Sequence, residues 1–304
     1  MARQHGLTEE RIAASEDFEN QDFADREKAA LRFAEQLTVD YRKLNGEIYE
    51  NLGRHFDLRE IAEIAVFSAW QGNGLRVIHS WKAETLWTEN RVPLPFTDES
   101  SIFGNPQAAK EPFDPRDPKR QMGRAAPSLV AGDAEQKRNR QPRGLPAQAT
   151  DRGTPPEWIS FLSHSPEALE GWSEFFRLVF AEGILDVRLK AAVGAQMARL
   201  LGSEVWFESF RERAGREGLD EIGSPRESAA LRYGECITTD YLAVDDELFE
   251  ELRRHFTDPE LIELGLFVGM MNGTFRLSQT LGIGGKGSQV AKMTGWRSPL
   301  NAGA

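Results

Sequence analysis

The chain has 304 residues, and its 48 Asp and Glu residues against 37 Lys and Arg residues leave a formal net charge of −11. Such an acidic chain is repelled by nucleic acid and by anionic membrane surfaces, so neither is an expected partner. The single cysteine, Cys236, excludes an intrachain disulfide or dithiol pair, and five scattered histidines predict no metal site or other cofactor.

The N-terminal residues are polar and contain no apolar region of the signal-peptide kind. The longest apolar run, 261–275, is interrupted by Glu263 and Asn272 and is too short to span a bilayer. A buried helix and a cytoplasmic location are therefore expected.

The first part of the chain repeats at a distance of 200 residues. Residues 26–76 and 226–276 share 20 identities over 51 positions without a gap, where chance would give about three. Arg54-His55-Phe56, for example, recurs as Arg254-His255-Phe256. The repeat indicates a duplication and predicts two copies of one fold.

The second copy is preceded by helical patterns, from about 155 to 212, that have no counterpart before Met1. The first copy is therefore expected to begin within its own domain and to leave an apolar face. Another subunit or the second domain is the expected cover for that face.

Residues 91–154 are rich in Pro, Gly, Asp and Arg and show no helical or strand periodicity. They are typical of a disordered linker, although their basic stretch 110–143 could also bind an acidic partner. The predicted organisation is an incomplete domain at 1–90, a linker at 91–154, a domain at 155–286 and a tail at 287–304.

Apolar residues recur at helical spacing through most of the second domain, and strand signals are almost absent. Asp258-Pro259 predicts a helix start with Asp258 as the cap. The fold class is therefore all-α, with two helical bundle modules joined by a long linker. The predicted helical segments are 172–180, 189–201, 229–237, 245–255 and 259–281.

The stretch from Glu247 to Leu264, followed by Asn272-Gly-Thr-Phe-Arg276-Leu, resembles the carboxymuconolactone decarboxylase / alkylhydroperoxidase D-like family. The preceding segments 214–221 and 225–238 fit the same resemblance. It covers about 155–285, and only the later helices in the first copy. It implies oligomers and either peroxiredoxin-type hydroperoxide reduction or decarboxylation of a small carboxylated lactone.

Hydroperoxidases of that family carry Cys-x-x-Cys-x-x-x-His and a Glu on the preceding helix. The resemblance aligns the cysteines with Ser203 and Trp206, the histidine with Phe210 and the Glu with Ala191. All four positions depart from the pattern, so the second domain is not expected to carry out dithiol chemistry. The first copy's equivalent would lie before Met1, which leaves open a hydroperoxidase whose active half precedes it.

Three residues are candidate catalytic groups for the lactone reaction. Glu204 and Glu208 lie one helical turn apart and could act as acid and base, or they could be surface charges paired with Arg211 and Arg213. His255 could move a proton near neutral pH, or it could be a cation that complements a helix C-terminus.

Arg276, repeated as Arg76, is the candidate substrate-binding residue because a guanidinium can hold a carboxylate through two hydrogen bonds. The alternative is an internal ion pair with Glu263 or Glu235. Cys236 is expected to be a buried, inert thiol. The tryptophans of the first copy are expected to be core or interface residues; they are Trp70, Trp81 and Trp87.

The expected function is that of a family member without the cysteine pair, either an enzyme acting on a small carboxylated molecule or a non-catalytic scaffold or regulator. The expected partners are a second copy of the chain or related subunits in a mixed oligomer.

Overall fold

A computed structural model describes residues 8–81, 155–214 and 223–284. Within these ranges the chain is helical and contains no strand, so the fold is all-α as predicted. The predicted linker at 91–154, the tail at 287–304 and Trp87 lie outside the described residues. None of the described helices is long and apolar enough to cross a membrane.

Residues 8–24 belong to a separate unit and contain helix α1 (Glu9–Ala14) and a 3₁₀ turn at Ser15–Asp17. Thr8 caps α1 by accepting a hydrogen bond from the Arg11 amide. The Arg11 side chain donates to the Asp22 carbonyl and lies over the Phe23 ring. These contacts close the segment on itself.

The remaining described helices form one unit, in which both copies of the repeat recur as the same series of elements. Each element of the first copy has its counterpart 200 residues later. The first series is α2 (Asp25–Asp40), a 3₁₀ turn η3 (Tyr41–Lys43), α3 (Gly46–Gly53) and α4 (Leu58–Ser80). The second series is α13 (Pro225–Thr239), a 3₁₀ turn η7 (Tyr241–Ala243), α14 (Asp246–His255) and α15 (Asp258–Leu281).

Four further helical segments precede the second series, and among the described residues of this unit they have no counterpart in the first copy. They are α9 (Pro156–Leu162), α10 (Pro166–Phe175) with a π-helical extension η6 (Phe176–Ala181), α11 (Val187–Leu200) and α12 (Glu204–Ala214). Helices α11 and α12 pack against each other, and α11 also packs on α13 and α15.

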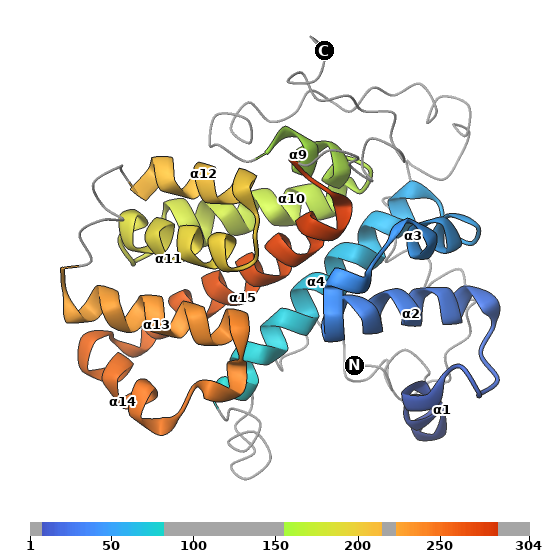
Figure 1. Ribbon diagram of the computed structural model, residues 1–304, viewed down its shortest axis with the longest axis horizontal. Helices are drawn as coiled ribbons and strands as arrows, with labels where there is room; N and C mark the ends of the chain where they lie inside the picture. The colour runs from blue at the N-terminus through green and yellow to red at the C-terminus, as the bar shows by residue number, and fades with distance from the viewer. Residues whose placement is uncertain (1–7, 82–154, 215–222, 285–304) are drawn as a thin grey trace, which may run out of the picture. The chain divides into compact units, whose positions relative to one another are not determined.

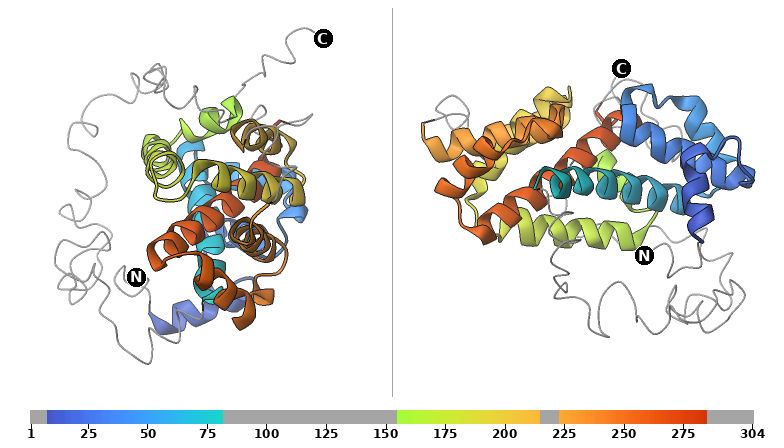
Figure 2. Two further views of the ribbon diagram at one scale, coloured as in Figure 1. Left: turned by 90° about the vertical axis from the view of Figure 1, so that its left-hand side faces the viewer. Right: turned by 90° about the horizontal axis from the view of Figure 1, so that it is seen from below.

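The equivalent helices α4 and α15 lie side by side and join the two copies (Figure 1). They remain adjacent in both views of Figure 2. Buried apolar side chains of both copies form one continuous core. The second copy thus covers part of the first copy's apolar surface. The second domain was one of the two covers expected for that face; the other was another subunit. The division into two modules stays a prediction.

A row of glycines permits this close packing. Gly265, Gly269 and Gly273 recur every four residues along α15 and face α4. A Cβ atom at Gly273 would lie 2.3 Å from the backbone oxygen of Ala69. Cβ atoms in proteins essentially never come that close to another heavy atom. The absence of a side chain at this position therefore sets the distance between the two helices.

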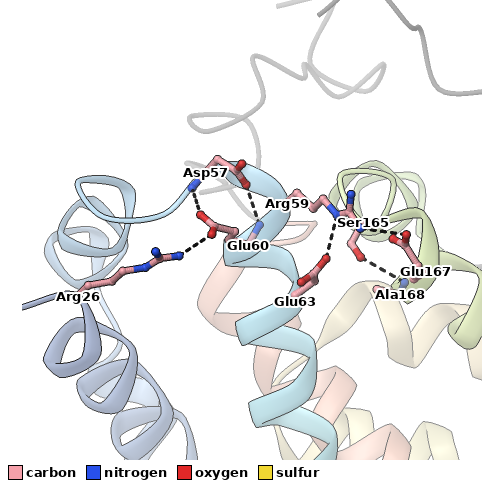
Figure 3. A network of polar contacts seen from close by, with 8 residues as sticks. All are labelled: Arg26, Asp57, Arg59, Glu60, Glu63, Ser165, Glu167 and Ala168. Carbon is pink, nitrogen blue, oxygen red and sulfur yellow. Dashed lines mark hydrogen bonds and ion pairs between the residues drawn. The ribbon is translucent and has the colours of Figure 1, made fainter. Parts of the chain in front are cut away.

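The N-termini of the two central helices are capped alike. Asp57 and Glu60 form a capping box at α4 (Figure 3). In α15 the capping residue is Thr257, with Glu260 completing the box, so the prediction of Asp258 as the cap was wrong by one residue. The Thr257 hydroxyl can accept from a backbone amide as the Asp57 carboxylate does.

Candidate functional site

Two arginines, one from each copy, lie where the copies meet. Arg76 on α4 donates to the Thr38 carbonyl at 2.9 Å, and Arg276 on α15 donates to the Thr238 carbonyl at 2.7 Å. Both carbonyls belong to the last turn of a helix, where backbone oxygens lack an intrahelical partner. Arg276 also donates through Nε to the Asn272 side chain at 2.6 Å.

Each guanidinium also reaches across to the other copy. Arg76 lies over the ring of Tyr241 at 5.3 Å, and Arg276 lies over the ring of Tyr41 at 4.9 Å. His79 adds an edge contact to Tyr241, with ring centroids 5.5 Å apart. Each copy thus places its arginine over the tyrosine of the other copy. Reciprocal contacts of this kind are typical of a twofold dimer interface, but here they occur within one chain.

The arginine pair is electrostatically unfavourable by itself. Burial, and to a lesser extent the nearby charge of Arg76, lowers the pKa of Arg276 to about 10, while Asp40 opposes the shift. Burial also lowers the pKa of Arg76. Within the described ranges, neither guanidinium forms an ion pair with a carboxylate. Two cations held together without an acidic partner make this centre a candidate anion site.

The predicted alternative for Arg276, an ion pair with Glu263 or Glu235, was wrong. Glu263 instead pairs with Lys190, and Glu235 accepts a hydrogen bond from the Gln196 amide at 3.3 Å. Tertiary contacts with backbone carbonyls replace the expected ion pair because α13 ends beside α15.

Lys190 and Glu263 form a buried pair that sequence reasoning missed. Lys190 Nζ lies 2.6 Å from Glu263 Oε1 and 2.6 Å from the Val179 carbonyl. Glu263 also accepts from the backbone amides of Ile184 and Leu185. The signal was present in the sequence, since Lys190 interrupts an apolar helical pattern and Glu263 is repeated as Glu63.

The three degenerate motif positions lie in the core. Ser203, Trp206 and Phe210 are all buried. Trp206 Nε1 donates to the Ser278 hydroxyl at 2.9 Å. The Ser203 hydroxyl is buried and has no hydrogen-bond partner among the described residues. These three side chains therefore take part in packing the core.

Aromatic rings fill the space around these positions. Trp206 contacts Trp158 and Trp172 with ring centroids 6.3 Å and 6.0 Å apart, and Phe210 contacts Phe180 at 5.4 Å. Trp158 and Trp172 are also fully buried. This aromatic cluster of Trp158, Trp172, Phe180, Trp206 and Phe210 is tightly packed and apolar.

The predicted carboxylates do not converge. Glu204 is exposed in the first turn of α12, while Glu208 forms an ion pair with Arg211 one turn later. His255 is the last residue of α14, the end of a helix where a cation is favourable, and its carbonyl accepts from Arg226. Among the described residues, no hydrogen bond or ion pair connects Glu204, Glu208, His255 and Arg276.

Cys236 and the first-copy tryptophans take structural positions. Cys236 is partly buried, and burial is the main cause that raises its thiol pKa, so little thiolate is present at neutral pH. Trp70 stacks on Trp172 with ring centroids 6.3 Å apart, and Trp81 packs against Gly265. No cluster of metal-ligating side chains occurs in the described ranges.

No family model matches the chain. Searches of curated proteins and of solved structures found no match either.

Proposed function

We propose that this chain is a carboxymuconolactone decarboxylase / alkylhydroperoxidase D-like protein that has lost its dithiol and acts as a scaffold or regulator in a mixed oligomer. The observation that supports this most is the aromatic cluster. Trp206 and Phe210 occupy two of the motif positions, and their packed aromatic rings place no thiol or imidazole there. Peroxide reduction by a dithiol needs two thiols that approach each other, and the chain has one.

A peroxide turnover assay tests the catalytic half of this proposal. With dithiothreitol and tert-butyl hydroperoxide, the full chain should consume peroxide no faster than dithiothreitol alone, and Cys236→Ser should behave identically. Enzymatic turnover that Cys236→Ser abolishes would contradict the proposal.

Native mass spectrometry tests the scaffold half. The full chain is mixed with a relative that carries Cys-x-x-Cys, and species that contain both chains are expected. Strictly separate homo-oligomers after prolonged mixing would argue against a mixed oligomer.

The arginine pair supports a second candidate function, the binding of a small carboxylated molecule. A carboxylate between Arg76 and Arg276 would add to the negative charge of nearby Asp40, which is itself ion-paired with Lys43. Binding would leave the helix-capping contacts of both guanidiniums in place, because each uses only some of its five donors.

Thermal shift with sodium succinate tests carboxylate binding, with sodium chloride at equal ionic strength as the reference. Succinate should stabilise the wild-type chain, and Arg76→Gln should lose most of this shift. The exposed Arg188 provides a matched control, Arg188→Gln, that should keep it. Equal shifts in all three proteins would exclude the site.

For Arg276, a folded Arg276→Ala variant without succinate binding would support the same role. Unfolding of that variant would assign Arg276 to structure, and the Arg76→Gln comparison would then decide alone.

A further inference from the structure

The internal repeat allows equivalent faces of α4 and α15 to be compared directly. The glycine row of α15 faces α4. The opposite face of α15 carries Phe267, Phe275 and Ser278. Phe267 contacts Phe180 at a centroid distance of 5.7 Å, and both Phe267 and Phe275 contact Phe210. Side chains from η6 and α12 cover this face, and α11 packs on α15 beside them (Figure 1).

The same positions of α4 are exposed. Phe67 is 61% exposed and Leu75 is 56% exposed, whereas their equivalents Phe267 and Phe275 are both 0% exposed. Ile78 is 41% exposed, against 1% for Ser278. We call this surface the outer face of α4; it comprises Glu63, Phe67, Gln71, Leu75 and Ile78.

The outer face has a defined edge. Helix α10 flanks it, because Arg59 bonds both Glu63 and Glu167 at 2.9 Å (Figure 3) and Trp70 stacks on Trp172. Beyond that edge, among the described residues, nothing covers Phe67, Leu75 and Ile78 as the equivalent face of α15 is covered. These three large apolar side chains, with Gln71 on the turn between Phe67 and Leu75, form a stripe that no other described helix covers.

The acidic end of the face shows which charge a partner should carry. In the second copy, the carboxylate of Glu263 pairs with Lys190 of α11. Its equivalent Glu63 is half exposed and, within the described part of the chain, forms an ion pair only with Arg59 of the same helix. A partner that lies on α4 in the way that α11 and α12 lie on α15 would have, opposite Glu63, the position that Lys190 takes opposite Glu263. A lysine at that position would pair with Glu63.

We infer that the outer face of α4 binds a two-helix hairpin of a partner protein, with an apolar, aromatic-containing face and a lysine opposite Glu63. The inference specifies the partner surface within the scaffold function proposed above, on which it rests. A second copy of α4 complements this face less well, because it would offer Glu63 again, and its cations, Arg59 and Arg76, are already bonded to Glu63 and Glu167 and to Thr38. Charge complementarity therefore favours a hairpin like α11–α12.

The chain itself supplies the probe, a fluorescent peptide of residues 186–214, which spans α11 and α12. Fluorescence anisotropy should show saturable binding to the full chain. Phe67→Glu should weaken binding by at least about tenfold, since it places a charge in an apolar contact. The matched control is Ile262→Glu. Ile262 is an exposed apolar residue of α15, outside the outer face of α4, so this variant should leave binding unchanged.

A charge swap makes the test specific to the predicted register. Glu63→Lys should weaken binding of the peptide, and a peptide carrying Lys190→Glu should restore it toward the wild-type value. Absent binding, binding insensitive to Phe67→Glu, or a swap without rescue would overturn the inference.

Size-exclusion chromatography with light scattering distinguishes the other occupant. If the full chain is a dimer that Phe67→Glu converts to a monomer while Ile262→Glu does not, a second copy occupies the face and the hairpin inference is wrong. The peptide assay requires no catalytic relative. Its failure therefore tests the hairpin inference alone, whereas the absence of mixed species in native mass spectrometry tests the scaffold function.

Discussion

At the scale of single residues, this protein holds its buried charges by contacts between distant parts of the chain. Arg276 donates to the Thr238 carbonyl and the Asn272 side chain and lies over Tyr41 of the other copy. Lys190 is fully buried and depends on Glu263 for its counter-charge. A buried charge that loses its partner carries the full penalty of desolvation, so both sites should respond strongly to substitution.

Lys190→Met should destabilise the chain by about 3–5 kcal/mol, because it leaves the Glu263 carboxylate without its cation. Urea unfolding measures the loss. The double variant Lys190→Met/Glu263→Gln should recover part of it, and additive losses in the double variant would show that the two residues are not coupled.

At the scale of elements, the fold depends on how α4 and α15 approach each other and on how their N-termini are capped. The glycine row of α15 allows the approach, and matching capping boxes start both helices. Arg26–Glu60 and Arg226–Glu260 then tie each first helix to its central helix in the same way.

Gly273→Leu should destabilise the chain by about 3 kcal/mol or more, because its side chain would meet the Ala69 backbone. Gly171→Ala in α10 is the matched control. A Cβ atom there meets nothing within 4 Å, so this variant should gain up to about 1 kcal/mol from helix propensity. Equal effects in thermal melts of the two variants would contradict the close approach.

The Glu260 carboxylate should make stability depend on pH. Its hydrogen bond from Arg226 is the main cause that lowers the pKa of Glu260 in the folded chain. The carboxylate therefore stabilises the fold above its unfolded pKa of about 4.3, and this contribution is lost as pH falls through the folded value. Glu260→Gln should cost about 1 kcal/mol at pH 7 and progressively less below pH ~4, as measured by urea unfolding. A difference independent of pH would contradict this role.

At the scale of the whole molecule, the two copies share one core, in which α4 packs on α15 and Tyr49 bonds Thr280 at 2.7 Å. Neither central helix can lose its partner without exposing buried apolar surface. Cooperative unfolding of both copies follows from such a shared core.

Differential scanning calorimetry should therefore show one main transition for the helices of both copies, with equal calorimetric and van't Hoff enthalpies. Gly273→Leu should move this whole transition to lower temperature. Two separate transitions, of which the variant moves only one, would show instead that the copies unfold independently.

The sequence by itself determined the helices, their order and the 200-residue repeat. Apolar periodicity and caps such as Asp57 and Ser224 are local signals, so the helical elements could be predicted from neighbouring residues alone. The identities of Ser203, Trp206 and Phe210 were likewise readable from the sequence, and they place no thiol or imidazole at these positions.

Only the tertiary structure decided which residues meet. The reciprocal contacts of Arg76 and Arg276 with Tyr241 and Tyr41, and the pairing of Lys190 with Glu263, join residues that are 73 to 235 positions apart. Such pairings depend on the distance and angle at which helices cross, which side-chain packing sets across the whole core. For the same reason, equivalent positions of the two copies, such as Phe67 and Phe267, are exposed in α4 and buried in α15.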